Sequence, residues 1–157
     1  MAHPLPSFAK LVQSYPNFAT SGEVFTLIGG MVQANHFSNS CVIRVSRALN
    51  YAGDPVQSGG GAHLVSGKDQ KWYAYRVAEF VTYMKNKYGP PAVVARAPQG
   101  RPPTPRGAFV GKRGVIAFKV TGWYDATGHF DLWDRDHCVH DEYFDKSFEV
   151  LLWQAPP

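Results

Sequence analysis

The sequence HFSNSCVIRVSRALNYAG, residues 36–53, decides the fold because it places a cysteine at the expected start of a helix. Val42, Val45 and Leu49 recur at the spacing of one helical face, and a glycine follows at a position typical of helix ends. The β-branched residues in this segment would also suit a strand. The polar run at 38–40, which is typical of helix starts, favours the helix.

Cys41 is the first residue of this predicted helix and a candidate nucleophile. Unpaired backbone N–H groups and the positive end of the helix dipole would surround its sulfur and favour the thiolate. Arg44, one turn further along, would either add positive potential or point into solvent. The alternative is a core residue, because a lone cysteine ahead of an apolar run is often a small buried hydrophobe.

A cysteine nucleophile needs a histidine within hydrogen-bonding distance, and a predicted hairpin over residues 114–134 supplies one. Apolar residues alternate along its first strand, the sequence DATG at 125–128 provides a turn, and the second strand begins near His129. A histidine at a strand start can be held rigidly and still face a cleft. A purely structural histidine is the alternative interpretation.

The imidazole of His129 would need a third group to fix its tautomer. The sequence HCVHDEYF, which follows the hairpin, offers His137, His140 and Asp141 as acceptors for the Nδ1–H of His129. Asp131 would share a strand face with His129. We nevertheless interpret Asp131 and Asp134 as turn or capping groups, because polar residues beside tight turns usually have that role.

The remaining pattern predicts one α+β domain over residues 1–157, with N-terminal helices packed on an antiparallel β-sheet. A chain of this length with 45% hydrophobic residues can bury a core without metal or disulfide. The other expected elements are a helix over 5–18, a short strand or buried turn over 22–30, a glycine-rich loop over 54–72, a helix over 75–89, a proline-rich surface loop over 95–107 and a strand over 148–154.

The net charge of +4 favours anionic partners such as nucleic acid, a membrane surface or an acidic cell-wall polymer, although the basic residues are scattered. No apolar run is long enough for a membrane helix, and the N-terminus has no recognisable export signal. Two other functions stay open: a non-catalytic cationic cell-wall-binding module and a zinc-dependent hydrolase. The candidate zinc ligands fit no established spacing; they are His129, His137, Cys138 and His140.

Two sequence blocks carry a family resemblance. One is Asn-x-Cys-x-x-Arg-x-Ser, beginning at Asn39, and the other is Gly-His-x-Asp-Leu-Trp, beginning at Gly128. Together with VSGKDQKWYAYRV at 65–77, they resemble the fourth family of type VI secretion amidase effectors. The likeness in order and spacing runs from about Pro6 to Phe144, which is nearly the whole chain.

The resemblance implies an NlpC-like, papain-like cysteine peptidase fold in which Cys41 is the nucleophile and His129 the base. It implies cleavage of the peptidoglycan amide bond that joins the γ-carboxyl of D-glutamate to meso-diaminopimelate. It also implies a toxin made in the cytoplasm without a signal peptide and carried by the type VI secretion apparatus into a rival's periplasm. A cognate immunity protein would protect the producer. No cofactor, metal, nucleic-acid partner or membrane insertion is expected.

The chain departs from the family pattern at the third catalytic position, where the family has an aspartate and this sequence has His140. NlpC-like relatives often use histidine there, so we predict His140 as the third member. Asp141 is the alternative, because a slip of one residue in a strand reverses which side chain faces the site.

A short disulfide of family members is also expected to be absent, because Glu142 stands where the second cysteine would be. Cys138 would then be a free thiol near the site, able to pair with Cys41 under oxidation. The oxyanion of the reaction is expected at the backbone N–H of Cys41, with Gln33 or Asn35 as a possible side-chain donor.

Overall fold

The computed structural model describes residues 3–17, 19–120 and 128–157. Its centre is an antiparallel five-stranded sheet of order β3-β7-β4-β5-β6. A separate two-stranded antiparallel sheet pairs β1 with β2. The strands are β1 Leu64–Ser66, β2 Trp72–Ala74, β3 Val93–Arg96, β4 Lys112–Val120, β5 Gly128–Arg135, β6 His137–Cys138 and β7 Ser147–Gln154.

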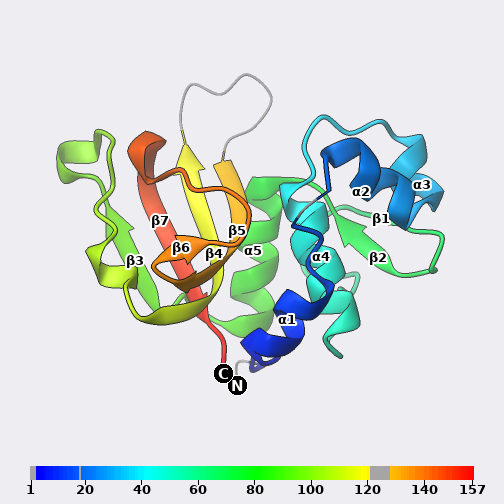
Figure 1. Cartoon of the computed structure of the whole chain (residues 1–157), viewed down its shortest axis with the longest axis horizontal. Helices are drawn as coiled ribbons and strands as arrows, with labels where there is room; N and C mark the ends of the chain where they lie inside the picture. The colour runs from blue at the N-terminus through cyan, green and yellow to red at the C-terminus, as the bar shows by residue number, and fades with distance from the viewer. Residues whose placement is uncertain (1–2, 18, 121–127) are drawn as a thin grey trace.

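The helices form a layer beside the sheet (Figure 1). α4 and α5 lie between the large sheet and the β1–β2 hairpin, and α2 and α3 flank that hairpin. The two termini lie close together at one end of the molecule. The α-helices are α1 Phe8–Ser14, α2 Ser21–Ile28, α3 Gly30–Ala34, α4 Cys41–Tyr51 and α5 Val77–Tyr88, and the short 3₁₀ helices are η1 Pro98–Gly100, η2 Gly107–Phe109 and η3 Phe144–Lys146.

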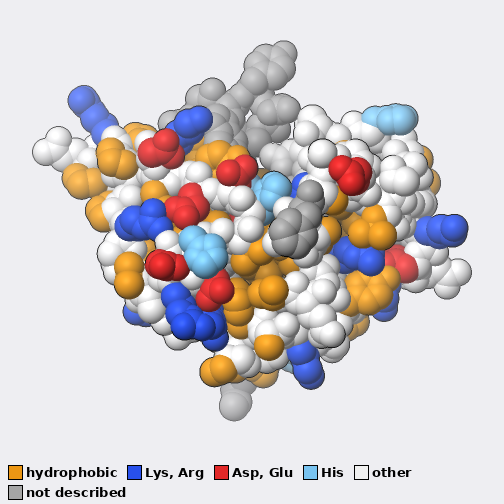
Figure 2. All heavy atoms as spheres, viewed as in Figure 1, with side chains coloured by type: hydrophobic (Ala, Val, Ile, Leu, Met, Phe, Trp, Pro, Cys, Tyr) orange, Lys and Arg blue, Asp and Glu red, His pale blue; other side chains and the backbone are white. Residues whose placement is uncertain are grey.

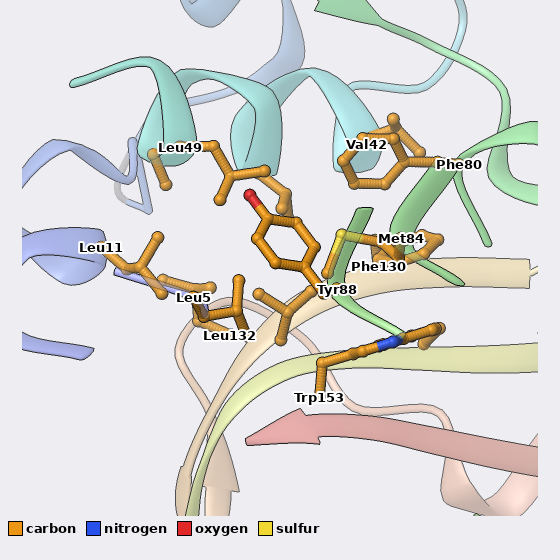
Figure 3. Close-up of a cluster of buried hydrophobic side chains, with 14 of the residues drawn as sticks. Leu5, Leu11, Val42, Leu49, Phe80, Met84, Tyr88, Phe130, Leu132 and Trp153 are labelled. Atoms are coloured by element: carbon orange, nitrogen blue, oxygen red, sulfur yellow. The ribbon is translucent and has the colours of Figure 1, made fainter. Parts of the chain in front are cut away.

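The main hydrophobic core presses α4 against the sheet. Figure 3 shows Val42 and Leu49 of α4 packed over Phe130 and Leu132 of β5, with side chains from α5 completing the cluster. These residues are all buried, and burial of each such side chain contributes roughly 1.5–3 kcal/mol to folding. The same packing holds the first turn of α4 against β5. The core therefore fixes where the cysteine lies relative to the hairpin.

The opposite face of the sheet is covered by loops and 3₁₀ turns rather than by α-helices. Phe118 and Trp133 project there, against Phe109 of η2 and Phe144 of η3. β4 is consequently buried on both faces in its middle, because Val115 and Ala117 face the helical layer while their neighbours face these aromatics.

Most of the predicted elements are confirmed. The α+β arrangement with an antiparallel sheet is present, as are the helix beginning at Cys41, the helix near 75–89, the hairpin near 114–134 and the strand near 148–154. The helix predicted over 5–18 is shorter, and Ser7 caps it by accepting a hydrogen bond from the backbone N–H of Lys10. The predicted DATG turn at 125–128 lies almost wholly outside the described residues.

The prediction of a strand or buried turn over 22–30 is wrong, because this segment forms α2. Thr20 and Glu23 close a capping box at its start, a pattern that stabilises a helix despite an apolar composition. Gly29, with φ of 67°, ends α2, and Gly30, with φ of 58°, is the first residue of α3. The segment is therefore helical except at Gly29.

Three short strands are not predicted. β1 lies within the segment predicted as a glycine-rich loop, β2 begins at the last residue of that segment, and β3 includes the first two residues of the predicted proline-rich loop. All three strands are too short for an alternating pattern to stand out. Within the described part of the chain, no helix is long and apolar enough to cross a membrane.

Candidate active site

Cys41 lies at the N-terminal end of α4 with a side chain that is 4% exposed. Its backbone N–H donates to the side-chain Oδ1 of Asn39 at 2.8 Å. This contact between residues two apart is an Asx turn that leads into α4, whose N-cap residue is Ser40. The expectation that this N–H holds an oxyanion is not met in the structure, because the N–H is already bonded.

The two predicted side-chain donors for an oxyanion are also elsewhere. The amide of Asn35 donates to the carbonyl of Met31 within α3. Neither Gln33 nor Asn35 is among the residues that line the cavity at Cys41. Sequence proximity to the cysteine misled this prediction, because α3 leads away from the site before the chain returns to α4.

His129 faces Cys41 from β5 and is 5% exposed. Both side chains line one cavity of about 160 Å³, whose other lining residues come from α4 and the residues just before it, from the start of α2 and from the loop after β6. The ring of Tyr143 packs edge-on against the imidazole with a centroid separation of 4.6 Å. The helix start and the distant hairpin thus meet, as the family resemblance implies.

The group that orients His129 is Asp131, two residues along the same strand. The Nε2–H of His129 donates to Asp131 Oδ2 at 2.8 Å, and the Asp131 side chain is fully buried. Residues two apart in a strand share a face, so the side chains of His129 and Asp131 lie next to each other. The prediction that Nδ1 contacts the orienting group is therefore wrong. Nε2 makes that contact, and Nδ1 is available to the sulfur of Cys41.

The Asp131 carboxylate is further held by three backbone N–H groups. Oδ1 accepts from Leu132 at 2.8 Å and from His140 at 3.1 Å, while Oδ2 accepts from Asp141 at 3.0 Å. A buried carboxylate that is fully hydrogen-bonded is compatible with a stable negative charge. Asp131 does brace the loop after β6, as a capping group would, but the prediction missed its bond to His129.

His140 and Asp141 do not orient His129 with their side chains. The Nδ1–H of His140 donates to the carbonyl of Asn17 at 3.1 Å, and the Asp141 carboxylate lies 3.4 Å from the hydroxyl of Tyr143. Both residues line the cavity. The loop contributes its backbone to the network, which no pattern of side-chain types could have indicated. The alternation His-x-Asp on a predicted strand was the signal available for Asp131.

The environment of His129 favours the protonated imidazole. Burial by itself lowers the pKa of His129, but hydrogen bonds to Asp131 and Cys41 and their negative charges outweigh burial and raise the pKa to about 9. At neutral pH, the ring is thus a proton carrier placed beside a thiol. An imidazolium next to the sulfur favours the thiolate form of that sulfur.

Cys138, in β6, is a second free thiol and is buried. Burial raises the pKa of Cys138 far above its usual range, so this thiol is inert at neutral pH. Glu142 accepts from the backbone N–H of Cys138 at 3.4 Å and pairs with Arg106 at 2.9 Å. The family disulfide is absent here, as expected, and the Arg106–Glu142 ion pair holds the loop after β6 in its place.

The candidate zinc ligands do not assemble. His137 pairs with Asp136 at the surface, Cys138 is buried, and His129 is bonded to Asp131. Among residues 3–17, 19–120 and 128–157, no three His, Cys, Asp or Glu side chains form a group that could hold a metal ion. The arrangement fits a cysteine nucleophile with a histidine proton carrier.

Comparison with known proteins agrees with this geometry. Residues 37–153 match the family of type VI secretion system amidase effector protein 4. No curated protein sequence matches the chain.

Solved structures of effectors from this family superpose over almost the whole chain. The Salmonella typhimurium effector Tae4, in complex with the immunity protein Tai4 from Enterobacter cloacae, has 29% identity and a TM-score of 0.85, covering 96% of this chain and 99% of its own. The E. cloacae effector alone has 32% identity and a TM-score of 0.84, covering 99% of both chains. The E. cloacae effector–immunity complex has 31% identity and a TM-score of 0.84, covering 96% of this chain and 98% of its own. The chain belongs to the family of type VI secretion system amidase effector protein 4.

Proposed function

We propose that Cys41, His129 and Asp131 hydrolyse the amide bond between the γ-carboxyl of D-glutamate and meso-diaminopimelate in peptidoglycan stem peptides. The observation that carries this proposal is the shared cavity of Cys41 and His129, with Asp131 bonded to the far nitrogen of the imidazole. Family membership supplies the reaction class, an amidase, and the geometry supplies the residues.

The proposed cycle starts with the proton on His129, whose pKa is raised to about 9, and the negative charge on the sulfur of Cys41. The sulfur attacks the γ-carbonyl carbon and forms a tetrahedral intermediate. His129 then gives its proton to the amine nitrogen of diaminopimelate as the C–N bond breaks, which leaves a thioester on Cys41. A water molecule loses its proton to the neutral imidazole and attacks the thioester. The C–S bond breaks, the new carboxylic acid departs and loses its proton to the solvent, and the thiolate–imidazolium pair is restored.

Asp131 acts on the imidazole alone. Its hydrogen bond to Nε2 keeps Nδ1 directed at the sulfur and stabilises the imidazolium that the cycle passes through. The edge-on ring of Tyr143 covers part of His129 and reduces its contact with bulk water. Reduced contact with water strengthens the electrostatic interactions inside the site.

The biological setting follows from the family. We propose that the type VI apparatus carries the chain into the periplasm of a rival Gram-negative cell, where the peptidoglycan substrate lies. The related effectors are solved with Tai4 immunity proteins, and we expect a cognate immunity protein to protect the producer.

The direct test is to incubate the protein with Gram-negative peptidoglycan and identify the cleaved bond by mass spectrometry. Wild type should release fragments that end in γ-D-glutamate and begin with diaminopimelate, and Cys41→Ala should release none. Retained cleavage by Cys41→Ala would contradict the nucleophile. Loss of activity with chelators, combined with indifference to thiol alkylation, would instead indicate a zinc hydrolase.

A further inference from the structure

Arg44 is a buried cation beside the nucleophile. It lies one turn along α4 from Ser40, is 2% exposed, and lines the same cavity as Cys41. Its Nε–H donates to Ser40 Oγ at 2.9 Å, and its terminal N–H groups donate to the carbonyls of Pro16 and Ala19. These acceptors are all electrically neutral.

No carboxylate of the described residues forms an ion pair with Arg44. Asp131, Asp141 and Cys41 act on it only at longer range, and the hydroxyl of Tyr15 is neutral at physiological pH because burial raises its pKa. A buried charge without a counter-ion is costly, and proteins usually pair it. The guanidinium of Arg44 therefore has no carboxylate in direct contact among the described residues, and the acidic groups that act on it do so from beyond hydrogen-bonding distance.

Two serine hydroxyls connect Arg44 to the cavity wall through hydrogen bonds. Ser21 Oγ and Ser40 Oγ are 2.9 Å apart, and both residues line the cavity. Because arginine only donates, Ser40 Oγ accepts from Arg44. The two hydroxyls hold two protons, and the bond between them uses one. Whichever serine donates in that bond, the other proton is used in no hydrogen bond of the described residues.

That remaining hydroxyl proton is a donor in a cavity that already contains the nucleophile and its base. The guanidinium polarises the serine pair, and hydrogen bonds that involve a charged group are about twice as strong as neutral ones. A donor backed by an unpaired cation suits an anion. On the face shown in Figure 2, Lys and Arg side chains are interspersed with Asp and Glu, so this face has no single basic patch that could capture an anionic substrate instead.

We infer that Ser21 and Ser40, backed by Arg44, bind the free α-carboxylate of the D-glutamyl residue whose γ-amide is cut. The inference rests on the proposed function. A glutamyl residue linked through its γ-carboxyl keeps its α-carboxylate, which is joined to the scissile carbonyl by a short carbon chain. The substrate would thus bring the counter-charge that Arg44 lacks when the site is empty. Ser21 and Ser40 are then specificity determinants of the reaction.

The test compares two soluble stem peptides that differ at one group. One carries γ-D-glutamyl with a free α-carboxylate, and the other carries the α-carboxamide; both end in meso-diaminopimelate. Wild type should cleave the carboxylate peptide roughly 10- to 100-fold more efficiently, as measured by kcat/KM. Ser21→Ala should lose about tenfold on the carboxylate peptide, chiefly through KM, and should change little on the carboxamide peptide.

Two variants of α2 control for structural effects. Ser21→Thr keeps the hydroxyl and should retain the preference for the carboxylate peptide. Thr26→Val removes a hydroxyl that donates only to the carbonyl of Gly22 within the helix, so it should behave as wild type. Equal losses on both peptides in Ser21→Ala, expressed in kcat, would assign the hydroxyl to the oxyanion and overturn the inference. Equal cleavage of both peptides by wild type would overturn it as well.

A binding experiment separates this inference from the proposed reaction. Cys41→Ala should bind the carboxylate peptide more tightly than the carboxamide peptide in calorimetry, and the double variant Cys41→Ala/Ser21→Ala should lose that preference. If the binding preference appeared but wild type cleaved neither peptide, the carboxylate subsite would be supported and the proposed reaction would be contradicted. The absence of any binding preference would refute the subsite, whatever wild type cleaves.

Discussion

The two walls of the cavity differ in how their charges are balanced. On the strand wall, the Asp131 carboxylate contacts His129 and three backbone N–H groups, so its hydrogen bonds and its charge are satisfied within the protein. On the helix wall, Arg44 contacts only neutral acceptors. A balanced network holds a proton carrier in one geometry. A cation without a contacting counter-ion can bind an anionic group of a ligand. We therefore expect the strand wall to take part in catalysis and the helix wall to bind the substrate.

The largest expected effect removes the reacting pair itself. Cys41→Ala or His129→Ala should lower kcat by at least about 10⁴-fold, because the nucleophile and its base act as a unit. The measurement is release of diaminopimelate-containing fragments from peptidoglycan. The double variant should be no worse than either single variant. Additive losses would show that the two residues act separately.

Breaking the strand wall should cost less. Asp131→Asn removes the charge but keeps the shape, and kcat should fall about 10²- to 10⁴-fold because the imidazole loses its fixed orientation. His140→Ala serves as the matched comparison, since the backbone N–H of His140 still reaches Asp131. That variant should lose less than about tenfold. The reverse order of the two losses would return the orienting role to His140.

The pH profile sharpens the same contrast. Activity requires the imidazolium, so kcat/KM of wild type should fall as pH rises through about 9, the pKa of His129. The Asp131 hydrogen bond raises that pKa, and burial lowers it. Asp131→Asn should therefore move the alkaline limb to lower pH. An unchanged limb would mean that another group sets it.

The smallest expected effect concerns the ion pair that holds the loop after β6. Arg106 and Glu142 are partly exposed, so Glu142→Gln should lower the free energy of unfolding by only about 0.2–1 kcal/mol. Thermal unfolding measures this, with Glu79→Gln as a control for a surface ion pair away from the site. A loss of activity without a loss of stability would show that the pair positions the loop rather than stabilising the fold.

The sequence was sufficient for the parts of the site that depend on local pattern. The helix start at Cys41 follows from a polar run before a helical stripe, and the strand of His129 follows from alternation. Their meeting follows from the family resemblance, since neither pattern states that a helix and a hairpin eighty-eight residues apart pack together. What failed depends on tertiary structure: Asp131 acquires its role only when a distant loop folds its backbone over it.

The burial of Arg44 was equally hidden. Its position one turn beyond the nucleophile is compatible with a side chain in solvent, but the carbonyls of Pro16 and Ala19, from the segment between α1 and α2, accept hydrogen bonds from Arg44 and help to bury it. That segment carries no pattern of its own. The error over α2 has a similar cause, because an apolar composition outweighed a capping signal at Thr20.

The most direct test of the orienting role of Asp131 is an NMR titration of the His129 imidazole in wild type, Asp131→Asn and His140→Ala. We expect a pKa near 9 in wild type, a clearly lower value in Asp131→Asn and an almost unchanged value in His140→Ala. A value that falls in His140→Ala and stays in place in Asp131→Asn would contradict this role of Asp131.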